Sequence, residues 1–296
     1  MPTMKPSALR AWLLATRPKT LLAGAVPVIV AASLASSEGH GTLWPACAAL
    51  VGSLLIQIGT NLVNDLADFK RGVDGPDRLG PARATSEGWL SIRQVGAGAA
   101  LCLGLAALIG VYIIAVGGWP LAVLGLVSLV CAVAYTAGPF PLAYVGLGDL
   151  FVLLFFGLGA VCGTYYLMCH QVSLAAVTAG LSLGALATAI IVVNNLRDRV
   201  GDAKADKRTL AVRFGPQVAR WEYAFLVVLA YASVVLAVAV AWAPVGWLLC
   251  LTTCPLAYRE VKAVWRKDGA ALNPHLGRTA ALETAFGATL ALGSFA

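Results

Sequence analysis

Long apolar stretches constrain this chain more than any other feature of its sequence. A helix needs about 20 mostly apolar residues to cross a bilayer, and only helices or closed barrels satisfy their backbone polar groups there. The chain has about nine such stretches, with the eighth short and the last ending at residue 296. They run over 20–37, 44–63, 95–116, 119–137, 147–168, 174–195, 223–242, 244–259 and 279–296. The sequence therefore predicts an all-α fold, a polytopic membrane bundle of about nine transmembrane helices.

The composition agrees with a membrane protein. Hydrophobic residues make up 59% of the chain and charged residues 12%, whereas a soluble domain carries about 25% charged residues. The length of 296 residues would suffice for two soluble domains, but the composition favours one transmembrane domain over 1–296. Residues 1–19 hold no apolar core followed by a cleavage site, so we expect a cytoplasmic N-terminal segment rather than a signal peptide.

The basic residues are confined to one side of the predicted bundle. All 21 lysines and arginines lie in the N-terminal segment or at the connections after the second, sixth and eighth stretches. If the chain crosses the membrane nine times, these four segments lie on the same side of it. The opposite side carries only Glu38, His40 and His170. The positive-inside rule predicts that the basic side faces the cytoplasm, and the expected location is a bacterial inner membrane. Basic residues here do not alternate with aromatic ones, so we expect no nucleic-acid partner.

Two polar motifs interrupt the apolar pattern in the same way, where the second and sixth stretches end. Each contains Asn-x-x-x-Asp followed by a further Asp. The repeat is offset by four stretches, which predicts two related four-helix units plus a ninth helix and a binding site between the units. The motif residues are Asn64, Asp68 and Asp74 in the first copy and Asn194, Asp198 and Asp202 in the second.

The spacing of these residues has a chemical consequence. Side chains four residues apart lie on one face of a helix, so Asn64 and Asp68 point the same way, as do Asn194 and Asp198. Such oxygen ligands suit Mg²⁺, which takes one or two carboxylates and completes its shell with substrate phosphates. Asn and Asp also commonly stand at exposed helix ends. The repetition of the motif and the high energy of carboxylates at membrane depth favour the metal site.

Further polar residues follow or precede the motifs. Arg83, Lys207 and Arg208 come soon after them and are suited to bind a diphosphate, although each is also explained as a topology signal beside lipid headgroups. Asp149 begins the fifth stretch. It is either a favourable partner for a helix N-terminus or a group that orients an aromatic hydroxyl and accepts its proton.

Several segments spread over the whole chain, together with the two Asp motifs and the nine stretches, carry a resemblance to a known family. They are ATRPKT (15–20), NDLADFKRGVD (64–74), YTAGPFPL (135–142), GTYY (163–166), NNLRD (194–198), KRTLAVRFG (207–215) and LNPHLGRT (272–279). The chain resembles the UbiA superfamily of intramembrane prenyltransferases. Within it, these segments look like the branch that uses 1,4-dihydroxy-2-naphthoate. Gly72 stands where the wider superfamily often has its last Asp, and this departure is the form expected in the naphthoate branch.

The resemblance implies a reaction. A polyprenyl group would pass from polyprenyl diphosphate to 1,4-dihydroxy-2-naphthoate with Mg²⁺ as cofactor and with decarboxylation, giving demethylmenaquinone for menaquinone biosynthesis. It implies that both Asp motifs hold Mg²⁺ and that Asp68 and Asp198 are catalytic. Asp149 is a further catalytic candidate. The rings of Tyr135, Tyr165 and Tyr166 would stabilise an allylic cation or serve as membrane-interface or packing residues. Arg17 and Lys19 would hold the naphthoate carboxylate or act as snorkelling anchors.

Two other functions are compatible with these features. One is prenyl transfer within the same superfamily to another aromatic acceptor. The other is a cation-coupled membrane transporter with an ion site between the repeats. The position of both motifs at cytoplasmic ends, beside many cations, suits a diphosphate better than a transported ion.

Overall fold

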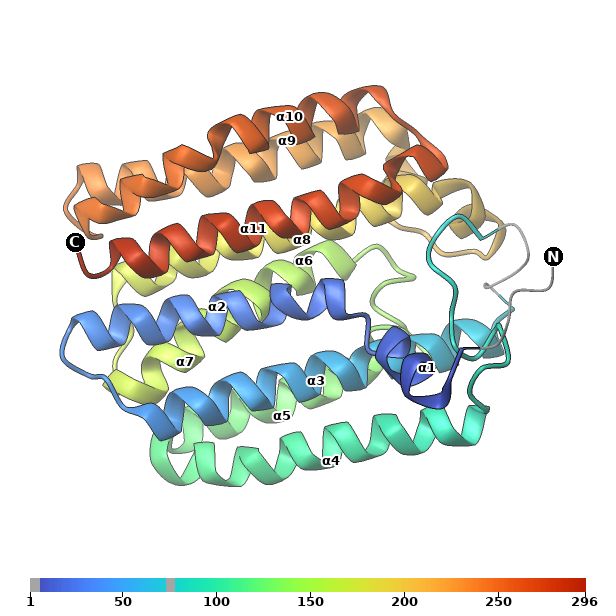
Figure 1. The fold of residues 1–296 in the computed structure, drawn as a ribbon, viewed down its shortest axis with the longest axis horizontal. Helices are drawn as coiled ribbons and strands as arrows, with labels where there is room; N and C mark the ends of the chain where they lie inside the picture. The colour runs from blue at the N-terminus through green and yellow to red at the C-terminus, as the bar shows by residue number, and fades with distance from the viewer. Residues whose placement is uncertain (1–5, 73–77) are drawn as a thin grey trace.

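Most described residues lie in helices that run side by side (Figure 1). The computed structural model describes residues 6–72 and 78–296, and this part of the chain contains no strand. The elements are α1 (Ala8–Ala15), α2 (Pro18–Ser37), α3 (Leu43–Lys70), α4 (Ile92–Gly117), α5 (Trp119–Ala134), α6 (Gly148–Val152), the π-helix η1 (Leu153–Gly159), α7 (Ala160–Cys169), α8 (Leu174–Lys204), α9 (Leu210–Ala239), the 3-10 helix η2 (Val245–Thr253), α10 (Cys254–Arg266), the 3-10 helix η3 (Gly269–Leu272) and α11 (Asn273–Gly293).

The prediction of an all-α membrane protein is confirmed. In the described part of the chain, six helical segments are long and apolar enough to cross a membrane, and α5 is a shorter apolar helix. The predicted stretches near the C-terminus are helical but are not among the six, and α10 carries four charged residues in 13. The six are Thr20–Ser37, Leu43–Lys70, Ile92–Gly117, Gly148–Cys169, Leu174–Lys204 and Leu210–Ala239.

Helix α8 is the most buried of these segments and organises the core. Of its most apolar window, 83% is buried, and α8 packs on α9, η1, α11 and α2. Glycines bring its backbone against η1: a Cβ at Gly157 would lie 2.3 Å from the Gly180 carbonyl oxygen and 2.5 Å from the Gly184 Cα. Small residues at such crossings permit close helix packing within a membrane. This contact fixes α6 and η1, and hence Asp149 at the start of α6, against α8.

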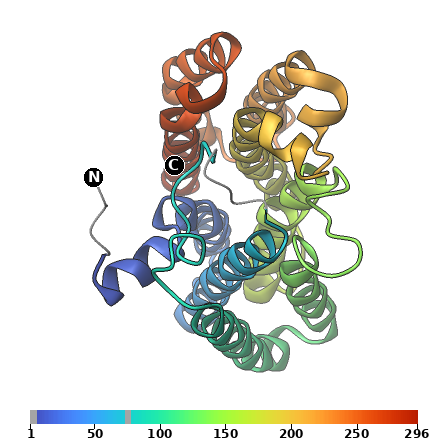
Figure 2. The same cartoon turned by 90° about the vertical axis from the view of Figure 1, so that its right-hand side faces the viewer.

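The connections that follow both Asp motifs lie at one end of the bundle. Helix α1 and the connections 78–91, 135–147 and 205–209 lie at the right-hand end in Figure 1, and Figure 2 faces that end. The C-terminus and the connections 38–42 and 170–173 lie at the opposite end. The motifs on α3 and α8 are therefore brought to the same end, as the sequence predicts from their placement.

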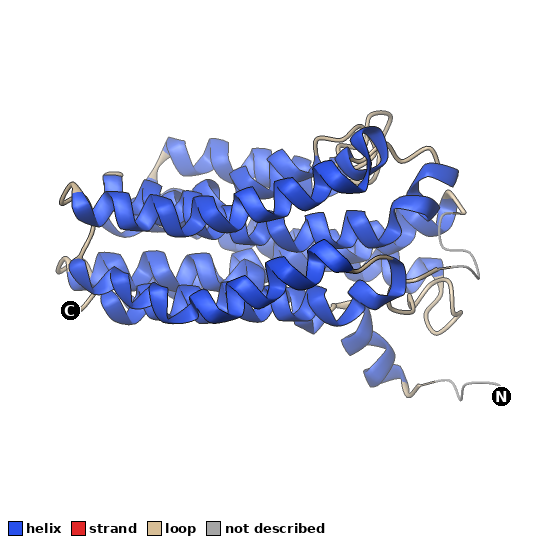
Figure 3. Ribbon diagram, turned by 90° about the horizontal axis from the view of Figure 1, so that it is seen from above, coloured by secondary structure: helices blue, strands red, loops and turns tan. Residues whose placement is uncertain are grey.

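Helix α1 projects from this end of the bundle (Figure 3). Ala11 and Ala15 pack with Leu62 of α3 and with residues near the start of α4, whereas Leu9 and Leu13 are exposed. Two amides of α3 hold the turn that follows. The Asn61 Nδ2 donates to the Thr16 carbonyl at 3.0 Å and the Gln57 Nε2 to the Thr20 carbonyl at 3.5 Å. The turn is thereby anchored to the helix that carries the first motif.

Two glutamates of the C-terminal helices, Glu260 and Glu283, are buried but differ in their hydrogen-bond partners. The Glu260 Oε2 lies 2.6 Å from the His275 Nδ1, and the His275 Nε2 lies 2.9 Å from the Lys267 Nζ. Glu283 is fully buried, and neither of its carboxylate oxygens has a hydrogen-bond partner within residues 6–72 and 78–296. A buried polar group without a partner destabilises the fold by about 1–3 kcal/mol, and more when charged.

We therefore expect Glu283→Met to raise the thermal unfolding temperature of the protein in detergent. The matched change Glu260→Met should lower it, because it leaves the buried His275 ring without its carboxylate. The two midpoints, measured under identical conditions, should move in opposite directions. A similar fall in both variants would contradict this description of Glu283.

Candidate active site at one end of the bundle

The first Asp motif lies on the last turns of α3, and its oxygens are held by other segments. The Asp68 carboxylate is buried; its Oδ2 lies 2.6 Å from an Arg83 guanidinium nitrogen, and its Oδ1 accepts a hydrogen bond from the Tyr144 hydroxyl at 2.8 Å. One turn earlier, the Asn64 Oδ1 accepts from the Thr136 hydroxyl at 2.5 Å. The connections 78–91 and 135–147 are thus both tied to this face of α3.

The second motif lies near the end of α8 and is occupied by an arginine within it. Arg197 donates from Nε to the Asp198 Oδ1 at 2.8 Å, and from a terminal nitrogen to the Asp198 Oδ2 at 2.5 Å and the Asn194 Oδ1 at 2.8 Å. Asp202 follows one turn on, with its Oδ1 3.3 Å from the Lys207 Nζ. The Asp202 Oδ2 is buried and has no hydrogen-bond partner in the described chain.

One polar pocket of about 170 Å³ is lined by Asn64 and Asp68 of the first motif and by Asn194 of the second. Its walls come from segments far apart in the sequence, including the ends of α3, α6 and α8. The predicted residues that line it are Arg17, Asn64, Asp68, Arg83, Tyr135, Asp149, Asn194 and Lys207. This arrangement places carboxylate and amide oxygens from both halves of the chain opposite three cations.

Other predicted residues lie beside or away from this pocket. Asp198 and Asp202 are not among the residues that line it, and their carboxylates contact Arg197 and Lys207 respectively. The Arg208 side chain is 65% exposed and pairs with Asp206 at 3.0 Å, outside the pocket. Asp74 falls outside the described residues, and so does the side chain of Lys19.

Arg17 presents a buried positive charge to the pocket. It adopts a left-handed backbone conformation with φ of 54° at the start of α2, which is unfavourable for an L-residue and turns the chain from α1 into α2. One terminal guanidinium nitrogen is buried and has no hydrogen-bond partner among the described residues. Burial, together with repulsion from Arg83 and Arg78, lowers the pKa of Arg17 to about 9. An anion that enters the pocket would be stabilised there.

Tyr144, beside the pocket, keeps its hydroxyl proton. Burial and the Asp68 carboxylate raise the pKa of Tyr144 above its ordinary value. The Tyr144 ring also lies under the Arg71 guanidinium, 4.4 Å from the ring centroid. Tyr144 therefore acts as a hydrogen-bond donor to Asp68, and Tyr135 offers its ring to the pocket.

Asp149 also lines the polar pocket and is held by α8. Its Oδ1 accepts a hydrogen bond from the Asn195 Nδ2 at 3.2 Å, and its side chain is buried. Asn195 directly follows the first residue of the second motif, so the same turn of α8 positions Asn194 and Asp149. The carboxylate is thus fixed toward the pocket rather than toward lipid.

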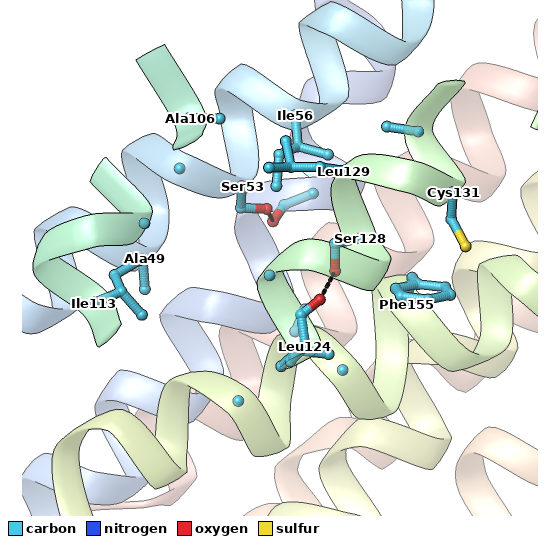
Figure 4. Close-up of a pocket in the computed structure, with 18 of the residues that line it drawn as sticks. Ala49, Ser53, Ile56, Ala106, Ile113, Leu124, Ser128, Leu129, Cys131 and Phe155 are labelled. Atoms are coloured by element: carbon cyan, nitrogen blue, oxygen red, sulfur yellow. Dashed lines mark hydrogen bonds between the residues drawn. The ribbon is translucent and has the colours of Figure 1, made fainter. Parts of the chain in front are cut away.

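A larger apolar cavity of about 410 Å³ adjoins the polar pocket. Helices α2, α3, α4, α5 and the segment α6 to α7 line it, and Figure 4 shows Ser53, Ile56, Leu124 and Phe155 among the side chains around it. The two cavities are adjacent, because they share five lining residues. These are Gln57, Thr60, Tyr135, Val152 and Phe156. The two cavities together suit a molecule with an anionic head and a long apolar tail.

Sequence reasoning missed several residues that hold the site together. Arg197 stands inside the second motif, three residues after Asn194, and this helical spacing was the available signal. Tyr144, Thr136 and Asn195 carried no such signal, because their partners lie far away in the sequence. Tyr165, a further candidate for cation stabilisation, lies toward the opposite end of the bundle, where its hydroxyl donates to the Glu38 carboxylate.

Comparison with known proteins shows which family and which folds the chain is similar to. A model described as the UbiA prenyltransferase family matches residues 25–281. The chain is 35% identical to the 1,4-dihydroxy-2-naphthoate octaprenyltransferase of Escherichia coli (strain K12), over 92% of this chain and 91% of that protein. It is 36% identical to the protein of the same name from Mycobacterium tuberculosis, over 86% of this chain and 85% of that protein. Among solved structures, a UbiA homolog from Archaeoglobus fulgidus bound to DMAPP and Mg²⁺ shares the fold, with a TM-score of 0.62 at 18% identity over 95% of this chain and 99% of that one.

Proposed function

The chain belongs to the UbiA prenyltransferase family, and from this premise we propose that it prenylates 1,4-dihydroxy-2-naphthoate. The reaction transfers a polyprenyl group from polyprenyl diphosphate and releases the naphthoate carboxylate as CO₂. The product is demethylmenaquinone in its reduced form, a precursor of menaquinone. The naphthoate octaprenyltransferases that match over most of this chain support the choice of acceptor.

One structural observation carries the proposal: the polar pocket beside the Asp motifs adjoins an apolar cavity and shares five wall residues with it. A polyprenyl diphosphate has this same division, with a charged head and a branched hydrocarbon tail. Burial of the tail is favourable and roughly proportional to the apolar area removed from water. The head would then lie beside Arg83 and Lys207, both of which line the polar pocket.

The residues of the two motifs fit a magnesium–diphosphate complex. No cluster of three or more His, Cys, Asp or Glu side chains arranged to hold a metal occurs in residues 6–72 and 78–296. The motifs instead offer a few hard oxygens each, including the buried Asp202 Oδ2 that has no partner in the described chain. Mg²⁺ accepts such a set when substrate phosphates fill its other positions. We propose Asn64, Asp68, Asp74, Asn194, Asp198 and Asp202 as its ligands; when bound, it supplies positive charge that stabilises the departing diphosphate.

The side chains around the pocket would then direct the reaction. The allylic C–O bond of the prenyl diphosphate breaks, and its electron pair leaves with the diphosphate toward Arg83 and Lys207. The ring of Tyr135, which lines both cavities, stabilises the allylic cation. The apolar walls beyond it exclude water, which would otherwise capture the cation.

The acceptor would enter with its carboxylate toward Arg17 and a hydroxyl toward Asp149. Both residues line the polar pocket. The ring carbon that bears the carboxylate attacks the cation and forms the new C–C bond. The bond to the carboxylate then breaks, its electrons return to the ring, and CO₂ leaves. Asp149 orients the hydroxyl that donates electron density, accepts its proton as the C–C bond forms, and returns it to the same oxygen when CO₂ leaves.

We further propose that the bundle crosses the membrane nine times, as two four-helix units and a ninth helix, with the N-terminus and both motifs in the cytoplasm. Six segments meet the length and hydropathy expected of a span, and α5 is a shorter apolar helix. The confinement of all 21 basic residues to one side supports this orientation. It places the pocket where cytoplasmic naphthoate and diphosphate reach it.

Expression in a bacterial host that lacks its own naphthoate prenyltransferase tests the function. We expect mass spectrometry of the extracted lipids to detect restored menaquinone. A prenylated 4-hydroxybenzoate or homogentisate instead would assign another acceptor within the family. Mg²⁺-dependent ion uptake by vesicles, without any lipid product, would favour the transporter.

Filling the apolar cavity should weaken binding of the prenyl donor selectively. Ser53 lines the cavity from α3, and Ser53→Phe would occupy space that the tail needs. Overpacking of this kind costs about 1–3 kcal/mol, which corresponds to an increase in KM for a long prenyl diphosphate of about 10–100-fold. The KM for naphthoate should stay within about twofold.

The matched control is Val51→Phe, on the same helix but 46% exposed. It should leave both KM values unchanged. An equal change in KM for the two substrates of Ser53→Phe, or an equal effect of Val51→Phe, would show that the apolar cavity does not hold the tail.

A further inference from the structure

Arg197 is a buried cation that already occupies the second Asp motif. The residue is 3% exposed, and its guanidinium contacts every side-chain oxygen of Asn194 and Asp198 at 2.5–2.8 Å. Bidentate contacts between arginine and a carboxylate are among the strongest charge-assisted hydrogen bonds in proteins. The oxygens that would bind a divalent cation on α8 are therefore engaged by this chain's own side chain.

Other segments hold the guanidinium in this position. Its remaining terminal nitrogen donates to the Asn273 Oδ1 at 3.1 Å, and the Asn273 Nδ2 donates to the Leu79 carbonyl at 2.8 Å. The connection after the first motif also passes directly over it, since a Cβ at Gly80 would lie 2.7 Å from an Arg197 nitrogen. Arg197 thus joins α8, the start of α11 and the 78–91 connection, as a buried side chain with contacts in all three segments.

The three carboxylates of the described motif residues each have a cation in contact. Asp68 has Arg83, Asp202 has Lys207 and Asp198 has Arg197. Buried carboxylates without such compensation destabilise a fold strongly. Arg83 and Lys207 also line the pocket and meet an entering diphosphate there, whereas Arg197 faces the motif oxygens and does not line the pocket. Arg197 is therefore positioned toward the metal ligands rather than toward the substrate.

We propose that Arg197 takes the place of the divalent cation at Asn194 and Asp198 in the metal-free protein and is displaced when the cation arrives with the diphosphate. This inference rests on the proposed function. A guanidinium and a metal ion cannot both be held by the same three oxygens. Because a guanidinium is a cation with hydrogen-bond donors only, the Arg197 side chain has to move away from these oxygens when the metal ion binds. Arg197 is then a positioning residue that keeps the second motif closed to free metal and makes metal binding depend on diphosphate.

The test measures binding of Mn²⁺ to the full chain in lipid nanodiscs by electron paramagnetic resonance, without diphosphate. Arg197→Gln should bind Mn²⁺ at least about tenfold more tightly than the wild type, the change expected for loss of one charge-assisted hydrogen bond. Addition of inorganic pyrophosphate should tighten Mn²⁺ binding to the wild type much more than to the variant. The control Arg199→Gln removes a charge two residues further along α8 and should leave Mn²⁺ affinity unchanged.

Equal or weaker Mn²⁺ binding by folded Arg197→Gln would overturn the proposal. If that variant does not fold, Asn273→Ala decides, because it removes the contact to the third guanidinium nitrogen, together with the Asn273 contact to the Leu79 carbonyl, and leaves the contacts of Arg197 to Asn194 and Asp198 in place. It should shift Mn²⁺ affinity in the same direction by a smaller factor, and an unchanged affinity would overturn the proposal. Product formation by the wild type is measured separately. If the wild type makes the quinone but Arg197→Gln binds Mn²⁺ no more tightly than the wild type, only the role of Arg197 is refuted. If the wild type makes no product, the proposed function is refuted.

Discussion

Replacement of Asp68 or Asp198 by alanine is expected to lower the rate of prenyl transfer by about a thousandfold or more. Asp68 lines the pocket between Arg83 and Tyr144, and Asp198 lies at the matching position of the second motif. Either change removes a carboxylate that we assign to the Mg²⁺–diphosphate complex. The departing diphosphate would then develop its charge without full compensation. The rate is measured in membranes with saturating polyprenyl diphosphate, naphthoate and Mg²⁺.

The control for this experiment is Asp206→Ala. The Asp206 carboxylate is 82% exposed and pairs with Arg208 away from the pocket, so its removal should leave the rate within about twofold. All three variants should insert into membranes in equal amounts. Near wild-type rates for Asp68→Ala or Asp198→Ala would refute the metal assignment, whatever the phenotype of the control.

Replacement of Arg17 by glutamine is expected to raise the KM for naphthoate by about 10–100-fold, the usual effect of losing a charge-assisted hydrogen bond. The Arg17 guanidinium lines the polar pocket and has a buried nitrogen without a partner in the described chain, so a substrate carboxylate is its expected contact. The KM for polyprenyl diphosphate should change little. Steady-state kinetics with each substrate varied in turn separates the two effects.

Two comparisons make this prediction specific. An acceptor that lacks the carboxylate, 1,4-naphthalenediol, should bind the wild type and Arg17→Gln with equal KM values. Arg10→Gln, on the exposed face of α1, should behave as the wild type with every substrate. If Arg17→Gln raised the KM of the diphosphate instead, Arg17 would belong to the donor site.

Much of this architecture was predictable because it depends on local patterns. Hydropathy located the helices, and the four-residue spacing placed Asn64 and Asp68 on one face of α3, where both line the same pocket. The repeat predicted that Asn194 would meet them across the bundle. The nine crossings and their orientation remain predictions, since the last helices carry charges and small polar residues that lower their hydropathy.

The details of the site depend on contacts between distant segments, which a single sequence does not encode in any local pattern. Asp198 was expected to point at a metal, but Arg197 next to it intervenes, held by Asn273 from α11. Arg208 was expected near the diphosphate, yet its side chain pairs with Asp206, which has a left-handed backbone conformation with φ of 51°. In both cases, backbone geometry and a neighbour remote in the sequence decide where the charge lies.

Decarboxylating prenyl transfer is tested most directly with the purified protein in lipid nanodiscs, polyprenyl diphosphate, Mg²⁺ and naphthoate labelled with ¹³C in its carboxylate. We expect one ¹³CO₂ to be released for each prenylated naphthoquinol formed, and both signals to be lost on chelation of the metal. A prenylated product that retains the label, or no prenylated product at all, would contradict it.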